Sequence, residues 1–221
     1  MKKSVQKEIK YKLIMLGDEN VGKTSIINRF KKNEYSGSYE PTIGLDFQTQ
    51  SITVDNLNVK LLLYDTAGQE KFRSLIPLYT KEANIIFLIY DISNYDSFSN
   101  IEKWHQLLDN INKDEGIFFL VGNKIDLTEE RKVKEEEAKA YADNNNFIFA
   151  EVSALNGDGI EDLFLNKLAN QIKIQLLNNE KFVRDQEEEN LKFNLQDIKE
   201  NKEKNKTKKN VVVVLNNNLY I

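Results

Sequence analysis

Four short segments follow one another along this chain and constrain its fold more than any other feature. The first, residues 17–24 (GDENVGKT), has the glycine, lysine and threonine spacing of a phosphate-binding P-loop. Residues 41–42 (PT), 65–69 (DTAGQ) and 123–126 (NKID) come after it. In a P-loop, backbone N–H groups surround an anion, the lysine reaches the terminal phosphates and the hydroxyl ligates Mg²⁺. The four segments together predict a binding site for Mg²⁺ and GTP.

Apolar runs of strand length alternate with helical patterns over most of the chain. The expected strands are residues 11–16, 45–54, 59–64, 85–90, 117–121 and 147–152. The expected helices are residues 23–31, 96–112, 134–144 and 159–177. Asp55 and Asn56 separate two of the strands and are a hairpin signal. This alternation predicts an α/β fold, with a mostly parallel sheet and helices on both of its faces.

The P-loop residues are the predicted phosphate contacts. Lys23 opens a helix directly after a strand, and the dipole and N–H groups at the start of that helix favour an anion. Thr24 offers a neutral oxygen to Mg²⁺. A glycine-rich turn that only caps a helix is the alternative interpretation. The remaining nucleotide contacts expected in this segment are Asn20, Val21, Gly22 and Ser25.

Two further segments carry the expected hydrolysis chemistry. Asp65 ends a strand and is placed to hold a Mg²⁺-bound water, the Gly68 N–H can face the γ-phosphate, and Gln69 would orient the attacking water. Thr42 lies in a polar loop, where its hydroxyl reaches Mg²⁺ only when a γ-phosphate is present, so this loop is a predicted switch. Standing alone, residues 65–69 would be an ordinary turn. The predicted metal ligands are Thr24, Thr42 and Asp65, and the predicted catalytic residues are Gln69, Lys23 and Thr42.

Residues 123–126 predict which base is bound. The Asp126 carboxylate can accept hydrogen bonds from the N1–H and 2-amino edge of guanine, which adenine does not offer. Such a site rejects an analogue lacking those groups by roughly 10⁴ or more. We expect Asn123 to tie this loop to the P-loop and Lys124 to stack along the base.

With these motifs in place, the chain resembles the Ras-like small GTPases and, within them, the Rab family of vesicle-traffic switches. Residues 43–47 (IGLDF), 64–74 (YDTAGQEKFRS) and 88–92 (LIYDI) look like Rab segments, and residues 72–79 (FRSLIPLY) are similar to the Golgi Rab subgroup. The resemblance covers about residues 10–177. It implies a P-loop NTPase small G domain at residues 1–177, with a six-stranded, mostly parallel sheet, one antiparallel strand and about five flanking helices.

The resemblance also assigns residues that the motifs alone do not. It makes Tyr35 the aromatic that covers guanine, and Ser153 and Ala154 the loop whose backbone contacts the base. Leu155 stands where the family usually has a lysine, which weakens nucleotide retention slightly and leaves the backbone contact available. The implied surface for exchange factor, activating protein and effectors comprises Ile43, Phe47, Tyr64 and Tyr79, with Tyr64 in place of the usual tryptophan.

Charge near the P-loop bears on the expected rate of GTP hydrolysis. Asp18 and Glu19 add negative charge beside the phosphates, and Glu19 is expected to slow hydrolysis. No loop arginine is an obvious cis finger, so we expect a slow monomeric GTPase that a trans arginine accelerates by roughly 10³ to 10⁵. Trp104 and His105 are expected to pack or cap in their helix without a catalytic role.

Composition bears on partners and location. The chain has no cysteine, one histidine and a formal net charge of −4, which exclude disulfides and thiolate or histidine metal clusters and give no electrostatic case for nucleic-acid binding. Residues 178–221 are expected to be a flexible tail rich in Asn, Lys and Glu, with no cysteine to prenylate. Without a signal-like or membrane-spanning run, we expect a cytoplasmic protein, peripheral on Golgi or other endomembranes.

Two rival functions are consistent with parts of this pattern. A non-switching module would hold nucleotide and hardly hydrolyse it, which only Glu19 and Leu155 favour. A P-loop kinase or other ATPase would share residues 17–24, but Asp126 counts against it. Turnover of Gln69→Leu and competition by ATP separate these from a GTP switch that regulates vesicle-mediated transport.

Overall fold

The computed structural model describes residues 9–33, 42, 45–66, 80–108 and 116–179. The chain divides into two units, residues 1–173 and 174–221, and the fold described here is that of the first. In the described ranges, no helix has both the length and the apolar character needed to span a bilayer.

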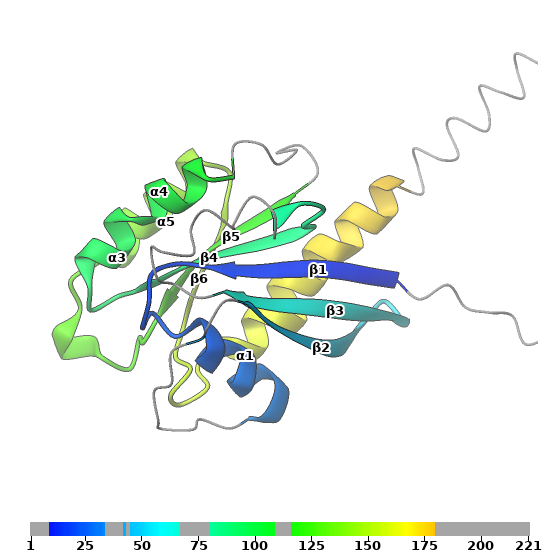
Figure 1. Cartoon of the computed structure of the whole chain (residues 1–221), viewed down its shortest axis with the longest axis horizontal. Coiled ribbons are helices and arrows are strands. Elements are labelled where there is room, and N and C mark those ends of the chain that lie inside the picture. Colours follow the sequence, from blue (N-terminus) through cyan, green and yellow to red (C-terminus); the bar gives the residue numbers. More distant parts are fainter. Residues whose placement is uncertain (1–8, 34–41, 43–44, 67–79, 109–115, 180–221) are drawn as a thin grey trace, which may run out of the picture. The chain divides into compact units, whose positions relative to one another are not determined.

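One sheet of six strands forms the centre of this unit, in the order β2–β3–β1–β4–β5–β6 (Figure 1). β2 pairs with β3 in antiparallel fashion, and the other neighbours are parallel. The predicted mostly parallel sheet with one antiparallel strand is confirmed. The strands are β1 Ile9–Leu16, β2 Leu45–Val54, β3 Leu57–Thr66, β4 Ile85–Asp91, β5 Ile117–Asn123 and β6 Ile148–Val152.

The turn between β2 and β3 follows the sequence signal closely. Asp55 and Asn56 have φ values of 45° and 68°, the left-handed conformation that a two-residue hairpin turn requires and that Asp and Asn tolerate. Val54 pairs with Leu57 across the turn, so the register is fixed there. The predicted hairpin is confirmed.

The helices depart from expectation at one place. The chain predicted as one helix at 96–112 forms two short helices that meet at Asn100, and residues 109–112 lie outside the described ranges. Asn favours caps and turns, because its side chain competes for nearby backbone groups, and Asn100 stands at the break, where its amide also donates to Asp18. The helices and helical turns are α1 Lys23–Lys32, α3 Tyr95–Ser99, α4 Ile101–Gln106, η2 Thr128–Glu130, α5 Glu135–Asn144 and η3 Asp162–Leu168, the last a π-helical stretch within a helix that begins at residue 160.

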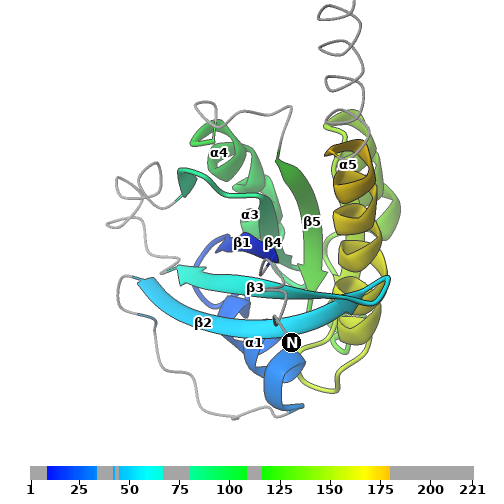
Figure 2. The same ribbon diagram turned by 90° about the vertical axis from the view of Figure 1, so that its right-hand side faces the viewer.

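The two faces of the sheet are covered by different helices. Figures 1 and 2 show α1 on one side and the α3–α4 pair on the other. Beneath α3, α4 and α5 lies a buried cluster that includes Leu88, Trp104 and Phe118. On the opposite face, Phe164 of η3 stacks on Phe30 of α1 with ring centroids 3.9 Å apart and contacts Phe87 of β4. Both faces are therefore packed, as a parallel sheet requires.

Strand register aligns the ends of the strands. Asp91 at the end of β4 pairs with Asn123 at the end of β5, and Asn123 pairs with Val152 at the end of β6. On the other side of β4, Met15 of β1 pairs with Asp65 of β3. Because parallel strands end at the same edge, the polar residues that follow them gather there, where open α/β sheets bind ligands.

Candidate functional site

The loop from β1 to α1 depends on two glycines. Gly17 has φ 149°, and a Cβ there would lie 2.2 Å from the Ile89 carbonyl oxygen. Gly22 has φ 95°, and a Cβ there would lie 2.3 Å from the Asn123 amide nitrogen. Only glycine fits either position without strain, so the tight curl of this loop and its closeness to β5 follow from the sequence.

Lys23 lies inside this curl. Its side chain is buried, and its Nζ donates to the carbonyl oxygens of Gly17 at 2.9 Å and Asp18 at 2.6 Å. Burial lowers the pKa of Lys23 to about 8, and the nearby carboxylates of Asp65, Asp18 and Glu19 oppose that shift. A buried cation is costly without a neutralising charge, so an anionic ligand at this loop would stabilise the ammonium form.

The start of α1 adds to this preference for anions. The helix begins at Lys23 after Gly22, has no acidic residue in its first turn and has no side-chain cap. First-turn N–H groups have no acceptor within their own helix and carry the positive end of the helix dipole. Asn20, Val21 and Ser25 lie in the same loop and first turn. The segment therefore offers both N–H donors and a cation to phosphate.

Three oxygen-bearing side chains meet beside the first turn. The Thr24 hydroxyl donates to Asp65 Oδ2 at 2.5 Å, and Thr24 Oγ1 lies 3.0 Å from Thr42 Oγ1. The Thr42 hydroxyl donates more weakly to the same carboxylate oxygen, at 3.4 Å. Burial raises the pKa of the Asp65 carboxyl, against the opposing effects of the Thr24 hydrogen bond and the Lys23 charge.

This cluster fits Mg²⁺. Asp65 Oδ1 is buried and has no hydrogen-bond partner within the described part of the chain. Hydroxyl and carboxylate oxygens are the ligands that this hard cation prefers. Within the described ranges no group of three His, Cys, Asp or Glu residues could hold a metal. Mg²⁺ is usually held by few protein groups together with water and substrate phosphates.

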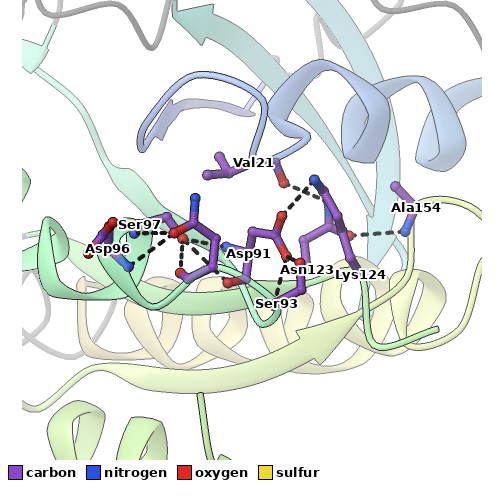
Figure 3. A network of polar contacts seen from close by, with 9 residues as sticks. Val21, Asp91, Ser93, Asp96, Ser97, Asn123, Lys124 and Ala154 are labelled. Carbon is purple, nitrogen blue, oxygen red and sulfur yellow. Dashed lines mark hydrogen bonds and ion pairs between the residues drawn. The ribbon is translucent and has the colours of Figure 1, made fainter. Parts of the chain in front are cut away.

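Asn123 joins two loops at the other end of the site. Its amide nitrogen donates to the Val21 carbonyl at 2.8 Å, and its amide oxygen accepts from the Ala154 N–H at 3.1 Å (Figure 3). Asn123 is 1% exposed. The bond to Val21 joins the loop of residues 123–126 to the P-loop, and the bond to Ala154, which was not expected, adds the loop after β6.

Lys124 is paired with the carboxylate of Asp91, which lies outside the four sequence motifs. Its Nζ lies 2.6 Å from Asp91 Oδ2, while Asp91 Oδ1 accepts from the Ser93 N–H and hydroxyl (Figure 3). Lys124 has φ 70°. Charge pairing with a buried side chain restricts the lysine, so Asp91 orients the residue expected to stack along the base.

The expected guanine-recognition residues lie close to one another. The Ser153 hydroxyl donates to Asp126 Oδ1. Arg29 of α1 donates through Nε to the Ala154 carbonyl at 2.9 Å and through its guanidinium to the Leu155 carbonyl. No sequence motif included this arginine. The Leu155 side chain is 49% exposed. The sequence gives only a weak signal for this contact, namely an arginine within the helix that follows the P-loop, because the two segments are far apart in sequence.

Asp18 has partners that the sequence does not indicate. Its charge acts on Lys23, and its carboxylate also accepts from Trp104 Nε1–H at 2.8 Å and the Asn100 amide at 2.7 Å. Trp104 is buried, as expected of a packing residue, and it also donates to the P-loop. The pairing joins segments more than eighty residues apart, and no local pattern signals it.

An aromatic pair lies on the exposed side of the β2–β3 hairpin. Phe47 is 51% exposed, and its ring centroid lies 5.1 Å from that of Tyr64. Lys12 Nζ lies 4.9 Å from the Tyr64 ring centroid. Exposed aromatic rings are typical of binding surfaces. The other site residues expected from sequence, Tyr35, Ile43, Gly68, Gln69 and Tyr79, lie outside the described ranges.

Comparison with known families agrees with this geometry. The model of the Ras family matches residues 12–174, most of the chain and nearly all of the first unit. The match spans each described element of the site, from the P-loop through Asp65 and Asn123 to Ser153. The chain therefore belongs to the Ras family of small GTPases.

Proposed function

We propose that this Ras-family GTPase acts as a Rab-like switch in vesicle-mediated transport, with Mg²⁺ and GTP held by the residues gathered at the carboxyl edge of the sheet. Family membership establishes a guanine-nucleotide-binding, GTP-hydrolysing protein. The Rab-like role and the duties of individual residues are the proposal.

The meeting of Thr24, Thr42 and Asp65 is the observation that carries it. Thr24 belongs to the phosphate-binding turn, Asp65 lies near the end of β3, and Thr42 comes from the segment between α1 and β2. Even so, Thr42 Oγ1 and Asp65 Oδ2 both lie within hydrogen-bond distance of Thr24 Oγ1. When bound, Mg²⁺ neutralises charge on the phosphates. Ligation of Mg²⁺ by the Thr42 hydroxyl would depend on the γ-phosphate, so the segment around Thr42 would report which nucleotide is present.

The remaining roles in the proposal come from the motifs and from the resemblance to small GTPases. Lys23 donates to the terminal phosphates, and Gln69 orients the attacking water, with the Gly68 N–H toward the γ-phosphate. On the base side, Asp126 accepts from guanine, Lys124 stacks along it, and the loop of Ser153, Ala154 and Leu155 closes over its edge. Tyr35 covers the other side of the base.

The Rab-like assignment is supported by the exposed Phe47 and the half-buried Tyr64 beside it, which we propose to bind effectors together with Ile43 and Tyr79. An exchange factor and an activating protein with a trans arginine would act on the neighbouring loops. We propose that the protein works as a monomer at the cytoplasmic face of Golgi or other endomembranes. The supporting feature is the similarity of residues 72–79 to Golgi Rab proteins.

Fluorescent GDP and GTP binding with Mg²⁺, combined with single-turnover GTP hydrolysis, tests the proposal in the full chain and in Gln69→Leu. We expect guanine-specific binding in both proteins. We also expect slow hydrolysis in the unsubstituted chain and a lower rate in the variant, because a leucine cannot orient water. Hydrolysis that is equally slow in both proteins would remove Gln69 from the mechanism, and binding of ATP in place of GTP would overturn the base assignment.

A further inference from the structure

The Asp18 side chain connects the P-loop to the helical layer on the α3–α4 face of the sheet. Both of its carboxylate oxygens are used, Oδ1 by Trp104 Nε1–H at 2.8 Å and Oδ2 by the Asn100 amide at 2.7 Å. Each is a charge-assisted hydrogen bond of ordinary length, the stronger class of such bonds. We propose that Asp18 is a positioning residue that fastens the P-loop to α4 and thereby slows nucleotide release.

The same residue also contacts the phosphate-binding lysine. The Asp18 main-chain carbonyl accepts from Lys23 Nζ at 2.6 Å, next to the Gly17 carbonyl at 2.9 Å. The side chain of Asp18 therefore faces α4 while its main chain faces Lys23. Movement of Asp18 would displace a carbonyl that sets the position of the Lys23 ammonium.

The far end of the tether is rigid. Trp104 is 1% exposed and belongs to the core cluster under α3, α4 and α5. Asn100 joins α3 to α4, and its carbonyl accepts from the Trp104 N–H at 3.1 Å. A loop residue bound to a packed core residue has little freedom to move, so the tether keeps the P-loop in one arrangement before and after nucleotide binds.

Loss of the tether and loss of the Asp18 charge are expected to change the rate of nucleotide release in opposite directions. Asp18 lies near the expected phosphates, so its negative charge by itself would weaken nucleotide binding, and its neutralisation would slow release. Loss of the tether would instead free the loop and speed release. Glu19 is the matched control, because it carries the same charge one residue along and its side chain is exposed.

The test compares Asp18→Asn with Glu19→Gln in the full chain, through the dissociation rate of mant-GDP in Mg²⁺. In Asp18→Asn, the new NH₂ group would face the N–H donor of either Trp104 or Asn100. Two donors cannot bond to each other, so at least one charge-assisted hydrogen bond is lost. We expect release to accelerate by about tenfold or more, the factor that such a bond can contribute. Glu19→Gln should slow release, because it removes negative charge near Lys23 and leaves the tether in place. Release from Asp18→Asn at or below the unsubstituted rate would overturn the proposal.

Trp104→Phe provides a second route to the same answer, because it keeps an aromatic ring and removes the N–H donor. We expect it to accelerate release, and the double variant with Asp18→Asn to release no faster than the faster single variant, since both remove one interaction. Multiplied effects in the double variant would contradict the tether. If Asp18→Asn does not fold, Trp104→Phe decides alone, by faster or unchanged release.

Trp104 is the chain's one tryptophan, so its fluorescence in the folded protein reports on the tether. Because the tether keeps the P-loop in one arrangement, the emission should change little when GDP is removed from the unsubstituted chain, and that change should be larger in Asp18→Asn. The inference rests on the proposed phosphate site. Failure of the unsubstituted chain to bind mant-GDP would refute that site, whereas normal binding with equal release rates would refute the tether alone.

Discussion

On the base side of the site, polar side chains pair with one another, whereas on the phosphate side several groups are arranged for a ligand to complete. Asn123 uses both ends of its amide within the protein, and Lys124 is paired with Asp91. By contrast, Asp65 keeps a buried oxygen without a partner in the described part of the chain, and Lys23 is a buried cation held by carbonyls.

We propose that this difference separates specificity from switching. A base site whose side chains already hold one another would require little rearrangement on binding, so its hydrogen bonds would discriminate between bases efficiently. The phosphate side, where Thr42 joins the cluster from a segment outside the sheet, can respond to the number of phosphates. We expect changes on the two sides to have separable effects.

The largest expected effect is on the base side, at Asp126. In Asp126→Asn, the side chain has one acceptor and one donor, which match the N1–H and 2-oxo group of xanthine and mismatch the 2-amino group of guanine. GDP affinity should fall by roughly 10⁴, the scale of discrimination when a hydrogen-bonding site is mispaired. Competition by GDP and by xanthosine diphosphate against a fluorescent nucleotide measures it.

Xanthosine diphosphate is the internal control for that variant, because its phosphates are the same as those of GDP. It should bind Asp126→Asn more tightly than GDP does, with the Mg²⁺ dependence of release unchanged. Retained preference for guanine would show that Asp126 does not contact the base.

A smaller effect is expected on the phosphate side, at Asp65. Asp65→Asn removes the charge from the carboxylate that accepts from Thr24 and Thr42. Groups that orient a metal or its water contribute about 10–100-fold to metal affinity, so retention of mant-GDP should require that much more free Mg²⁺. The measurement is release rate against Mg²⁺ concentration.

Saturating Mg²⁺ should restore slow release in Asp65→Asn, and its preference for guanine over xanthine should equal that of the unsubstituted chain. An unaltered Mg²⁺ dependence would place the ion elsewhere. A changed base preference would break the separation between the two sides.

The sequence predicts what local patterns encode and misses what tertiary contacts add. The strands, the hairpin at Asp55 and the placement of motifs at strand ends follow from apolar periodicity and turn chemistry, which act over a few residues. The bonds of Asp18 to Trp104 and Asn100 could not be predicted, because the fold brings these partners to it. The break at Asn100 in the helix expected at 96–112 was missed because the apolar spacing continues through it.

The smallest expected effect concerns Arg29, which braces the base-side loop from the phosphate-side helix and so tests how separate the two sides are. Arg29→Lys keeps the charge but loses the planar fork that reaches the Ala154 and Leu155 carbonyls together. Loss of about one hydrogen bond should speed mant-GDP release by less than about tenfold. Arg131→Lys is the matched control, because Arg131 forms a fork with Glu151 and contacts no expected nucleotide residue among those described. Arg131→Lys should lower the thermal stability of the protein and should not speed the release of mant-GDP. If Arg29→Lys also changed the Mg²⁺ dependence of release, Arg29 would couple the two sides, and the base pocket would take part in switching.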